Sequence, residues 1–271
     1  MLEIDGEREH YLATKRAIVA RAGRGPGRTG GAAADAAVAR AEAFVRTQLH
    51  EADPARFDPA QLAELGLDAL MLEAQEDLAV MQLPNLLAPA RARALYLHVC
   101  FPSGWNPARM LGKSFLSLHA HVPYADGFER AVRAEHAARL FTEPAVRFVW
   151  SLTPEAELDH HPDSTRSTDW TRTREAFLRV ERQVIQPLPA AAEQRDATDA
   201  GTVTLFFIRT YVYPLERLRS EQLRELVSAL ACMPESVRRY KGLLGHEERI
   251  VELIGAAEAR DLARGGSEHR A

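Results

Sequence analysis

The amino-acid sequence predicts an α+β fold, in which an antiparallel sheet is wrapped by N-terminal and C-terminal helices. Apolar residues in the first and last thirds of the chain recur at helical spacing, whereas five segments in the middle alternate as strands do. Hairpin-like links or helices of uneven length separate these strands, and no internal repeat is detectable. This irregular order favours antiparallel pairing over regular crossover units.

The N-terminal third is predicted to be helical, with one break. Residues 7–21 have a mixed-charge helical pattern, and Ala32 to Glu51 is alanine-rich with apolar residues at helical spacing. Between them, Arg21 to Gly31 is rich in arginine and glycine, which interrupts regular structure. A helical pair is expected over Leu62 to Met81, ended by Pro84.

The Arg/Gly-rich stretch contains a formal G-x-G-x-x-G, from Gly25 to Gly30. A dinucleotide-binding loop follows a strand and opens a helix, but the preceding segment here is helix-like and charged. Pro26 also removes an amide donor that a phosphate would need. We therefore expect a flexible linker. The predicted organisation is residues 1–31 as N-terminal segment and linker, 32–262 as one domain, and 263–271 as a disordered tail.

The strand predictions rest on alternation of side chains along five segments. These segments are Arg93 to Phe101, Ser114 to His119, Ala145 to Leu152, Phe177 to Ile185, and Thr202 to Tyr213. A short helix is expected from Asn106-Pro107, a charged helix over Asp126 to Phe141, and helices from Ser220 onward. The connection between Pro189 and Gly201 is long for a hairpin.

Composition and charge exclude several classes of protein. The chain has 271 residues, 46% hydrophobic and 27% charged, as in ordinary globular proteins. A net charge of -4 gives no basic footprint for nucleic acid. No apolar run approaches a membrane span, and the acidic start has no signal-peptide pattern. Two cysteines suit a reducing compartment, so we expect a cytoplasmic protein.

Two histidines, His119 and His121, are the first candidates for chemistry. Neutral imidazole is the commonest protein metal ligand, and side chains two apart on a strand point to the same face. A hydrogen-bonded structural histidine is the alternative, which the spacing leaves open. By contrast, His160-His161 lies in a polar loop, where solvated side chains are expected.

Arginines on apolar strand faces are the second anomaly. Arg182 shares a face with Val180 and Val184, and Arg209 shares one with Leu205 and Phe207. An arginine stays protonated, so burial requires an anion. That anion is either an acidic side chain elsewhere, Glu76 or Asp77 among the candidates, or a ligand carboxylate. Haem would satisfy both anomalies, with iron for imidazole and propionates for arginine.

The sequence gives little support for nucleophilic catalysis or for a zinc site. No G-x-S-x-G is present, and Ser103 lacks the surroundings of a nucleophile elbow. Cys100 has no neighbouring base, which favours an inert buried thiol. Neither H-E-x-x-H nor a zinc spacing of cysteines occurs.

An ordered set of motifs resembles one known family. The motifs are Gln75-Glu76-Asp77-Leu78, Pro102-Ser103-Gly104-Trp105, Gly112-Lys113, His119-x-x-Val122-Pro123, Glu181-Arg182-Gln183, Leu188-Pro189, Ile208-Arg209-Thr210-Tyr211 and Tyr240-Lys241-Gly242. From roughly Asp5 to Leu253 the chain resembles the haem-dependent oxidative N-demethylase alpha-subunit family.

The resemblance implies a PAS-like five-stranded antiparallel sheet that holds haem b. It also implies oxygen-dependent demethylation of a small secondary amine, with release of formaldehyde. Electrons would come from NADPH through a reductase partner that carries FMN and a [2Fe-2S] cluster. Self-association stays open. The alternative is a haem-PAS sensor or binding module without turnover.

Carried over by position, the resemblance assigns roles to residues. His119 matches the proximal iron ligand, although His121 stands where the family has a proline, so the choice between them is open. Glu181 is a polar pocket residue that would hold the substrate ammonium, and Arg182 and Arg209 would face propionates or the distal pocket as further catalytic candidates.

Four further residues are candidate cofactor contacts: Trp105, Lys113, Arg147 and Tyr211. Val149 departs from the family pattern, which would have asparagine before Trp150. The substrate can therefore differ from that of other members, and fold and haem binding are the firmer expectations.

Overall fold

The computed structural model describes residues 1–21, 23–83, 91–120, 122–123, 139, 141–165, 168–188 and 202–268. Its centre is a six-stranded sheet in which every pair of neighbours is antiparallel. In spatial order the strands are β1 (Gly27–Arg28), β3 (Arg93–His98), β2 (Asp77–Leu83), β6 (Thr202–Pro214), β5 (Phe177–Leu188) and β4 (Ala145–Thr153). The structure therefore confirms an α+β fold with an antiparallel sheet.

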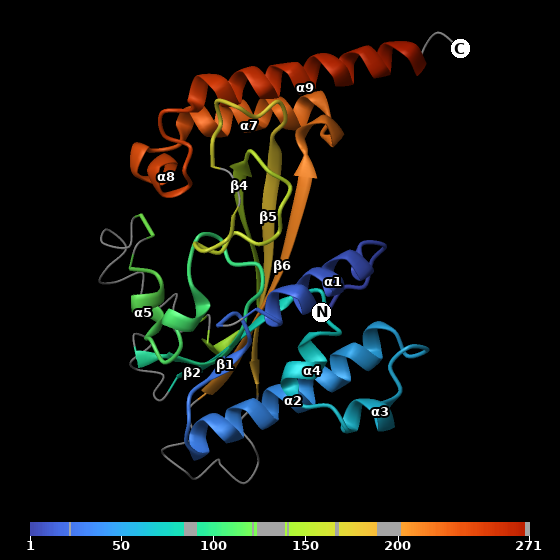
Figure 1. The fold of residues 1–271 in the computed structure, drawn as a ribbon, viewed down its shortest axis with the longest axis vertical. Coiled ribbons are helices and arrows are strands. Elements are labelled where there is room, and N and C mark those ends of the chain that lie inside the picture. Colours follow the sequence, from blue (N-terminus) through green and yellow to red (C-terminus); the bar gives the residue numbers. More distant parts are fainter. Residues whose placement is uncertain are drawn as a thin grey trace.

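Helices from both ends of the chain surround this sheet (Figure 1). The described α-helices are α1 (Arg8–Val19), α2 (Ala32–Ala52), α3 (Pro59–Ala63), α4 (Leu67–Met71), α5 (Phe115–Leu118), α7 (Ser220–Cys232), α8 (Glu235–Tyr240) and α9 (Glu247–Glu268). Short 3-10 turns occupy Pro107–Arg109 and Leu215–Arg217. In the described part of the chain, no helix combines the length and apolarity needed to cross a bilayer.

The two faces of the sheet have different coverings. On one face, α2, α3 and α4 pack against strand residues such as Leu78, Val80 and Phe207 to form the largest apolar core. At the end of β4 to β6 that lies away from α2, α3 and α4, the helices α7 and α9 form a second core with Leu152 and Trp170 (Figure 1). The other face carries a third apolar cluster with α5 but also opens into a pocket.

Two predictions of local structure were wrong. Residues 77–83 form β2 and not the end of a helix. This central strand is buried on both faces, so its near-continuous apolar run fits the helical period of 3.6 residues as well as the strand period of two. Ser114 to His119 is not a strand. Ser114 Oγ accepts the Ser117 amide hydrogen at 3.2 Å, an N-cap interaction that starts α5.

The Arg/Gly-rich segment contributes β1, whose Gly27 and Arg28 pair with Leu97 and Tyr96 of β3. Because β1 and β2 are added and the strand expected over Ser114 to His119 is a helix, the sheet has six strands where five were expected. At the other end, α9 continues to Glu268. Most of the predicted helix over 126–141 and the connection at 189–201 lie outside the described residues.

Candidate functional site

A pocket of about 680 Å³ lies on the face of the sheet opposite α2, within the range of small-molecule and cofactor sites. Its floor is made by alternate residues of β4 and β5, which include Arg147, Val149, Arg179, Glu181 and Gln183. The walls come from the turn after β3, from α5, and from the segment at the end of α8.

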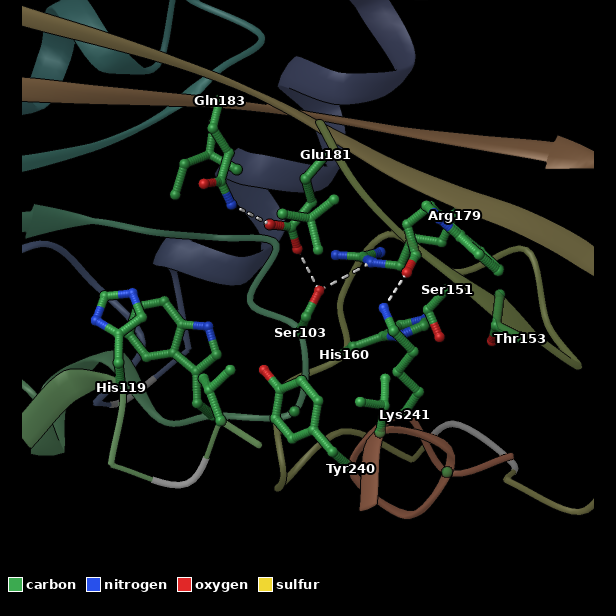
Figure 2. A pocket seen from close by; sticks show the side chains of 18 of the residues that line it. Ser103, His119, Ser151, Thr153, His160, Arg179, Glu181, Gln183, Tyr240 and Lys241 are labelled. Atoms are coloured by element: carbon green, nitrogen blue, oxygen red, sulfur yellow. Dashed lines mark hydrogen bonds between the residues drawn. The ribbon is translucent and has the colours of Figure 1, made fainter. Parts of the chain in front are cut away.

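The pocket has an apolar end and a polar end. Apolar side chains from β2, β3, β6 and α5 line the first: Met81, Leu97, Phe115, Leu118 and Phe206. Around the second lie His160, Arg179, Glu181, Tyr240 and Lys241, seen with His119 in Figure 2. A ligand in this pocket would therefore have one apolar part and one polar or charged part.

His119 lies at the apolar end, just after the last residue of α5. Its Nδ1 lies 2.8 Å from the Phe115 carbonyl oxygen, one helical turn earlier, and its ring lies against the Phe115 ring at 4.4 Å. Because a carbonyl only accepts, Nδ1 carries a proton, and in the neutral ring the lone pair is on Nε2. Iron-ligating and zinc-ligating histidines are held by this kind of bond from the other ring nitrogen.

Hydrogen bonds on the pocket floor converge on Glu181 from two directions (Figure 2). On one side, Arg147 Nε donates to Gln183 Oε1 at 2.6 Å, and Gln183 Nε2 donates to Glu181 Oε2 at 2.8 Å. On the other, Arg179 Nε donates to Ser103 Oγ at 3.1 Å, and the Ser103 hydroxyl donates to Glu181 Oε1.

Both chains begin at an arginine, and an arginine has no acceptor. The direction of every hydrogen bond is therefore fixed, and both series of hydrogen bonds end at the Glu181 carboxylate. The array places one negative charge in the polar end of the pocket and supports it with donors. Such an acceptor suits a cationic ligand with N–H groups.

The turn that carries Ser103 is held from below by a buried carboxylate. Asp77, at the start of β2, accepts the amide hydrogens of Cys100 and Phe101 at 3.0 and 2.7 Å. Gly104 continues the turn with a φ of +81°, which favours glycine, and its amide donates to the His160 carbonyl at 2.9 Å. Ser103 is therefore fixed in position on both sides.

Contrary to expectation, His160 and His161 are buried, although Pro162 and Asp163 of the same loop are exposed. Its residues pack on the Ser103 turn, and Asp159 anchors the loop through an ion pair with Arg24 at 2.7 Å. His161 Nδ1 accepts the Asp163 amide hydrogen, and burial lowers the pKa of His161. Among the described residues, no group of three or more potential metal-binding side chains occurs here or elsewhere.

Lys241 and Tyr240 form the pocket wall that faces Glu181. The Lys241 ammonium donates to the Trp150 carbonyl and lies 5.4 Å from the centroid of the Trp150 ring. Burial lowers the pKa of Lys241, and the Glu181 charge acts against that shift. Burial also raises the pKa of Tyr240.

The structure brings four of the predicted site residues together: Trp105, His119, Arg147 and Glu181 line the pocket. Lys113 is exposed and is not part of the lining. His121 lies outside the described residues.

Three other predicted residues, Arg182, Arg209 and Tyr211, lie on the opposite face of the sheet. There Arg182 contacts Glu3 at 3.2 Å, and Arg209 contacts Asp5 at 2.8 Å. Tyr211 donates its hydroxyl to Glu3. The anions that these arginines require come from the N-terminal segment, and neither Glu76 nor Asp77 pairs with them within the described ion-pair distances.

Sequence reasoning missed several pocket residues. Arg179 and Gln183 share a strand face with Glu181, so a run of alternate polar residues on β5 was the available signal. Lys241 and Ser103 lie in two of the family motifs, Tyr240-Lys241-Gly242 and Pro102-Ser103-Gly104-Trp105, but alternation gave no signal for them because they lie outside the strands.

Comparison with known families finds a match over most of the chain. A family model described as haem-dependent oxidative N-demethylase, alpha subunit-like, matches residues 1–251. The chain belongs to this family. A search of curated proteins finds no match. The family description indicates a haem-dependent oxidative enzyme, and the term alpha subunit is consistent with a partner subunit.

The pocket residues fit a haem. A porphyrin supplies four iron ligands, so the protein needs to add only an axial one, and His119 has the tautomer for that role. The apolar end of the pocket suits the macrocycle. Arg147 is half-buried and forms no ion pair among the described residues, which leaves it available to a propionate.

Proposed function

We propose that this N-demethylase-family protein binds haem b in the pocket and oxidatively demethylates a small amine. Electrons would come from an NADPH-dependent reductase that carries FMN and a [2Fe-2S] cluster, as the family resemblance implies. For a secondary amine, one O₂, two electrons and two protons yield the primary amine, formaldehyde and water. Bound haem would supply the oxygen activation, and the chain would supply the remaining functions.

The observation that carries this proposal is the carboxylate of Glu181 at the end of two donor chains, in the same pocket as His119. A protonated amine has N–H donors and a positive charge, which this acceptor complements. Apolar side chains beyond it would surround the methyl groups. Binding at Glu181 would therefore orient a methyl group within the pocket, as a proximity effect.

The remaining residues have supporting roles in this proposal. His119 would be the axial ligand, with Nδ1–H held by the Phe115 carbonyl. Arg147 would contact a propionate while its Nε keeps Gln183 oriented. Trp105, beside the apolar end, would contact the macrocycle. Lys241 and Tyr240 would close the side of the pocket opposite Glu181 and limit water access.

The ligand assignment is tested by His119→Ala in protein produced with added haem precursor. We expect loss of stoichiometric haem, measured as the Soret absorbance per protein and as the pyridine haemochrome of haem b. His50→Ala is the matched control, because His50 makes the same kind of Nδ1–carbonyl contact, to Phe57 at 2.8 Å, outside the pocket. A normal haem spectrum in His119→Ala would exclude His119 and direct attention to His121.

The substrate assignment is tested by Glu181→Gln, which keeps the shape of the side chain and removes its charge. Formaldehyde release from dimethylamine should fall by at least 100-fold, while haem content stays within about 20% of the wild-type value. Glu225→Gln on the exposed surface of α7 is the control. Equal loss of haem and turnover would make Glu181 structural, and a wild-type protein that binds haem but consumes no reductant with any amine would favour a sensor.

A further inference from the structure

Ser103 lies on the turn after β3, and its hydroxyl joins two charged residues of the pocket. A serine hydroxyl has a single proton to donate. Because Arg179 Nε already donates to Ser103 Oγ at 3.1 Å, that proton points to Glu181. Ser103 is thus a one-way link from a guanidinium to a carboxylate.

Arg179 is itself rigidly held. Its side chain is 3% exposed, and its Nη1 and Nη2 groups donate to the carbonyls of Leu158 and Phe101 at 2.9 and 2.8 Å. These contacts engage both terminal nitrogens of the guanidinium and orient its Nε–H toward Ser103. The position of the Ser103 hydroxyl is therefore determined from the protein interior.

Each oxygen of Glu181 receives one donor. Gln183 holds Oε2 and Ser103 holds Oε1, so the two bonds together fix the plane of the carboxylate. The χ3 torsion of a glutamate is otherwise broad, and a freely rotating carboxylate would point its lone pairs in many directions. With the plane fixed, the remaining lone pairs have one direction into the pocket.

We propose that Ser103, oriented by Arg179, is a positioning residue that sets the carboxylate plane of Glu181 and thereby the selectivity of the pocket for ammonium-type ligands. This inference rests on the proposed function and adds a residue to which no role has been assigned. It also explains why a polar residue occupies the Phe101–Trp105 turn, where no nucleophile geometry exists.

The test measures ligand binding and does not depend on turnover. The full chain, loaded with haem and also without haem, is titrated by calorimetry with dimethylammonium chloride and with dimethyl ether, a neutral analogue of similar shape. The variants are Ser103→Ala, Ser103→Thr and the reference Glu181→Gln. Ser151→Ala is the matched control, because its hydroxyl also lies at the pocket but, among the described residues, donates to the Leu152 carbonyl at 3.3 Å and not to Glu181.

We expect Ser103→Ala to weaken dimethylammonium binding about tenfold, the effect of one lost charge-assisted hydrogen bond. Dimethyl ether binding and the melting temperature should be unchanged. Ser103→Thr keeps the hydroxyl and should stay within threefold of wild type, and Ser151→Ala should match wild type. A merely structural role would weaken both ligands equally.

Two results distinguish failure of the Ser103 role from failure of the proposed function. If Glu181→Gln loses selectivity for dimethylammonium but Ser103→Ala keeps it, the positioning role of Ser103 is refuted and the proposed function stands. If wild-type protein does not distinguish dimethylammonium from dimethyl ether, the substrate role of Glu181 and this inference both fail. Should Ser103→Ala lower the melting temperature, Ser103→Cys provides the same comparison with a weaker donor.

Discussion

Replacement of Asp77 by asparagine should destabilise the protein strongly and loosen the turn that carries Ser103. The Asp77 side chain is fully buried and accepts the Cys100 and Phe101 amide hydrogens. Lys15 Nζ, also fully buried, lies 3.8 Å from Asp77 Oδ1 and donates to three backbone carbonyls. Asp77 is thus both the acceptor for the turn and the counter-charge for a lysine.

The magnitude follows from these contacts. Asparagine offers one oxygen and one NH₂ group, so one of the two amide hydrogens would face a donor, which costs about 1–3 kcal/mol. Removal of one partner of a buried ion pair costs about 3–5 kcal/mol, and the two effects overlap at one side chain. We expect the free energy of unfolding of Asp77→Asn to fall by about 4 kcal/mol, a large part of the about 5–15 kcal/mol typical of whole domains.

Urea unfolding of haem-free protein, followed by far-UV circular dichroism, measures this change. With an m-value of about 3 kcal/mol/M, the midpoint should fall by about 1.3 M. Asp35→Asn is the control, because Asp35 is exposed and lies 3.8 Å from Arg28. A loss below about 1 kcal/mol for Asp77→Asn would refute the reasoning that this carboxylate supports the pocket turn.

Three further changes test other contacts. His98 is buried, with no partner for Nε2 among the described residues, and burial lowers its pKa well below the ordinary 6.5. The unfolded state therefore binds more protons than the folded state below pH 6.5, and the free energy of unfolding of the wild type should fall there by about 1.4 kcal/mol per pH unit. A pH series of urea unfolding curves should show a flatter profile for His98→Phe. Asp5→Asn removes the charge beside buried Arg209 and should cost about 2 kcal/mol in the same assay, between the values for surface and buried pairs, whereas an unchanged midpoint would mean that Arg209 needs no anion. Lys241→Met removes the donor to the Trp150 carbonyl and should lower the melting temperature by about 2–4 °C, as loss of about 1 kcal/mol does in a domain of this size.

The sheet was predicted where its strands have one apolar face, and missed where they do not. β4, β5 and β6 alternate clearly, and their predicted bounds differ from the observed ones by few residues. β2 lies between β3 and β6 and is buried on both faces, so its sequence does not alternate. Tertiary position, which a local pattern does not contain, decided its conformation.

The candidate site was predicted in part for a related reason. Alternation correctly placed Glu181 and Arg182 on opposite faces of β5, but it could not show which face holds the pocket. His119 lies at the pocket although its predicted strand is a helix end. Ser103 depends on Asp77, which lies on a different strand, and no spacing in the sequence connects them.

The arginines of β5 show how one residue type acquires two uses on a single strand. Arg182 faces the N-terminal segment, where Glu3 neutralises it, and its neighbour across the sheet, Arg209, is neutralised by Asp5. Arg179 faces the pocket and donates to the Leu158 and Phe101 carbonyls and to the Ser103 hydroxyl. Through the Ser103 hydroxyl, Arg179 is connected to one oxygen of the Glu181 carboxylate. The serine between these two side chains therefore links a buried arginine to the carboxylate that we propose to bind the ligand.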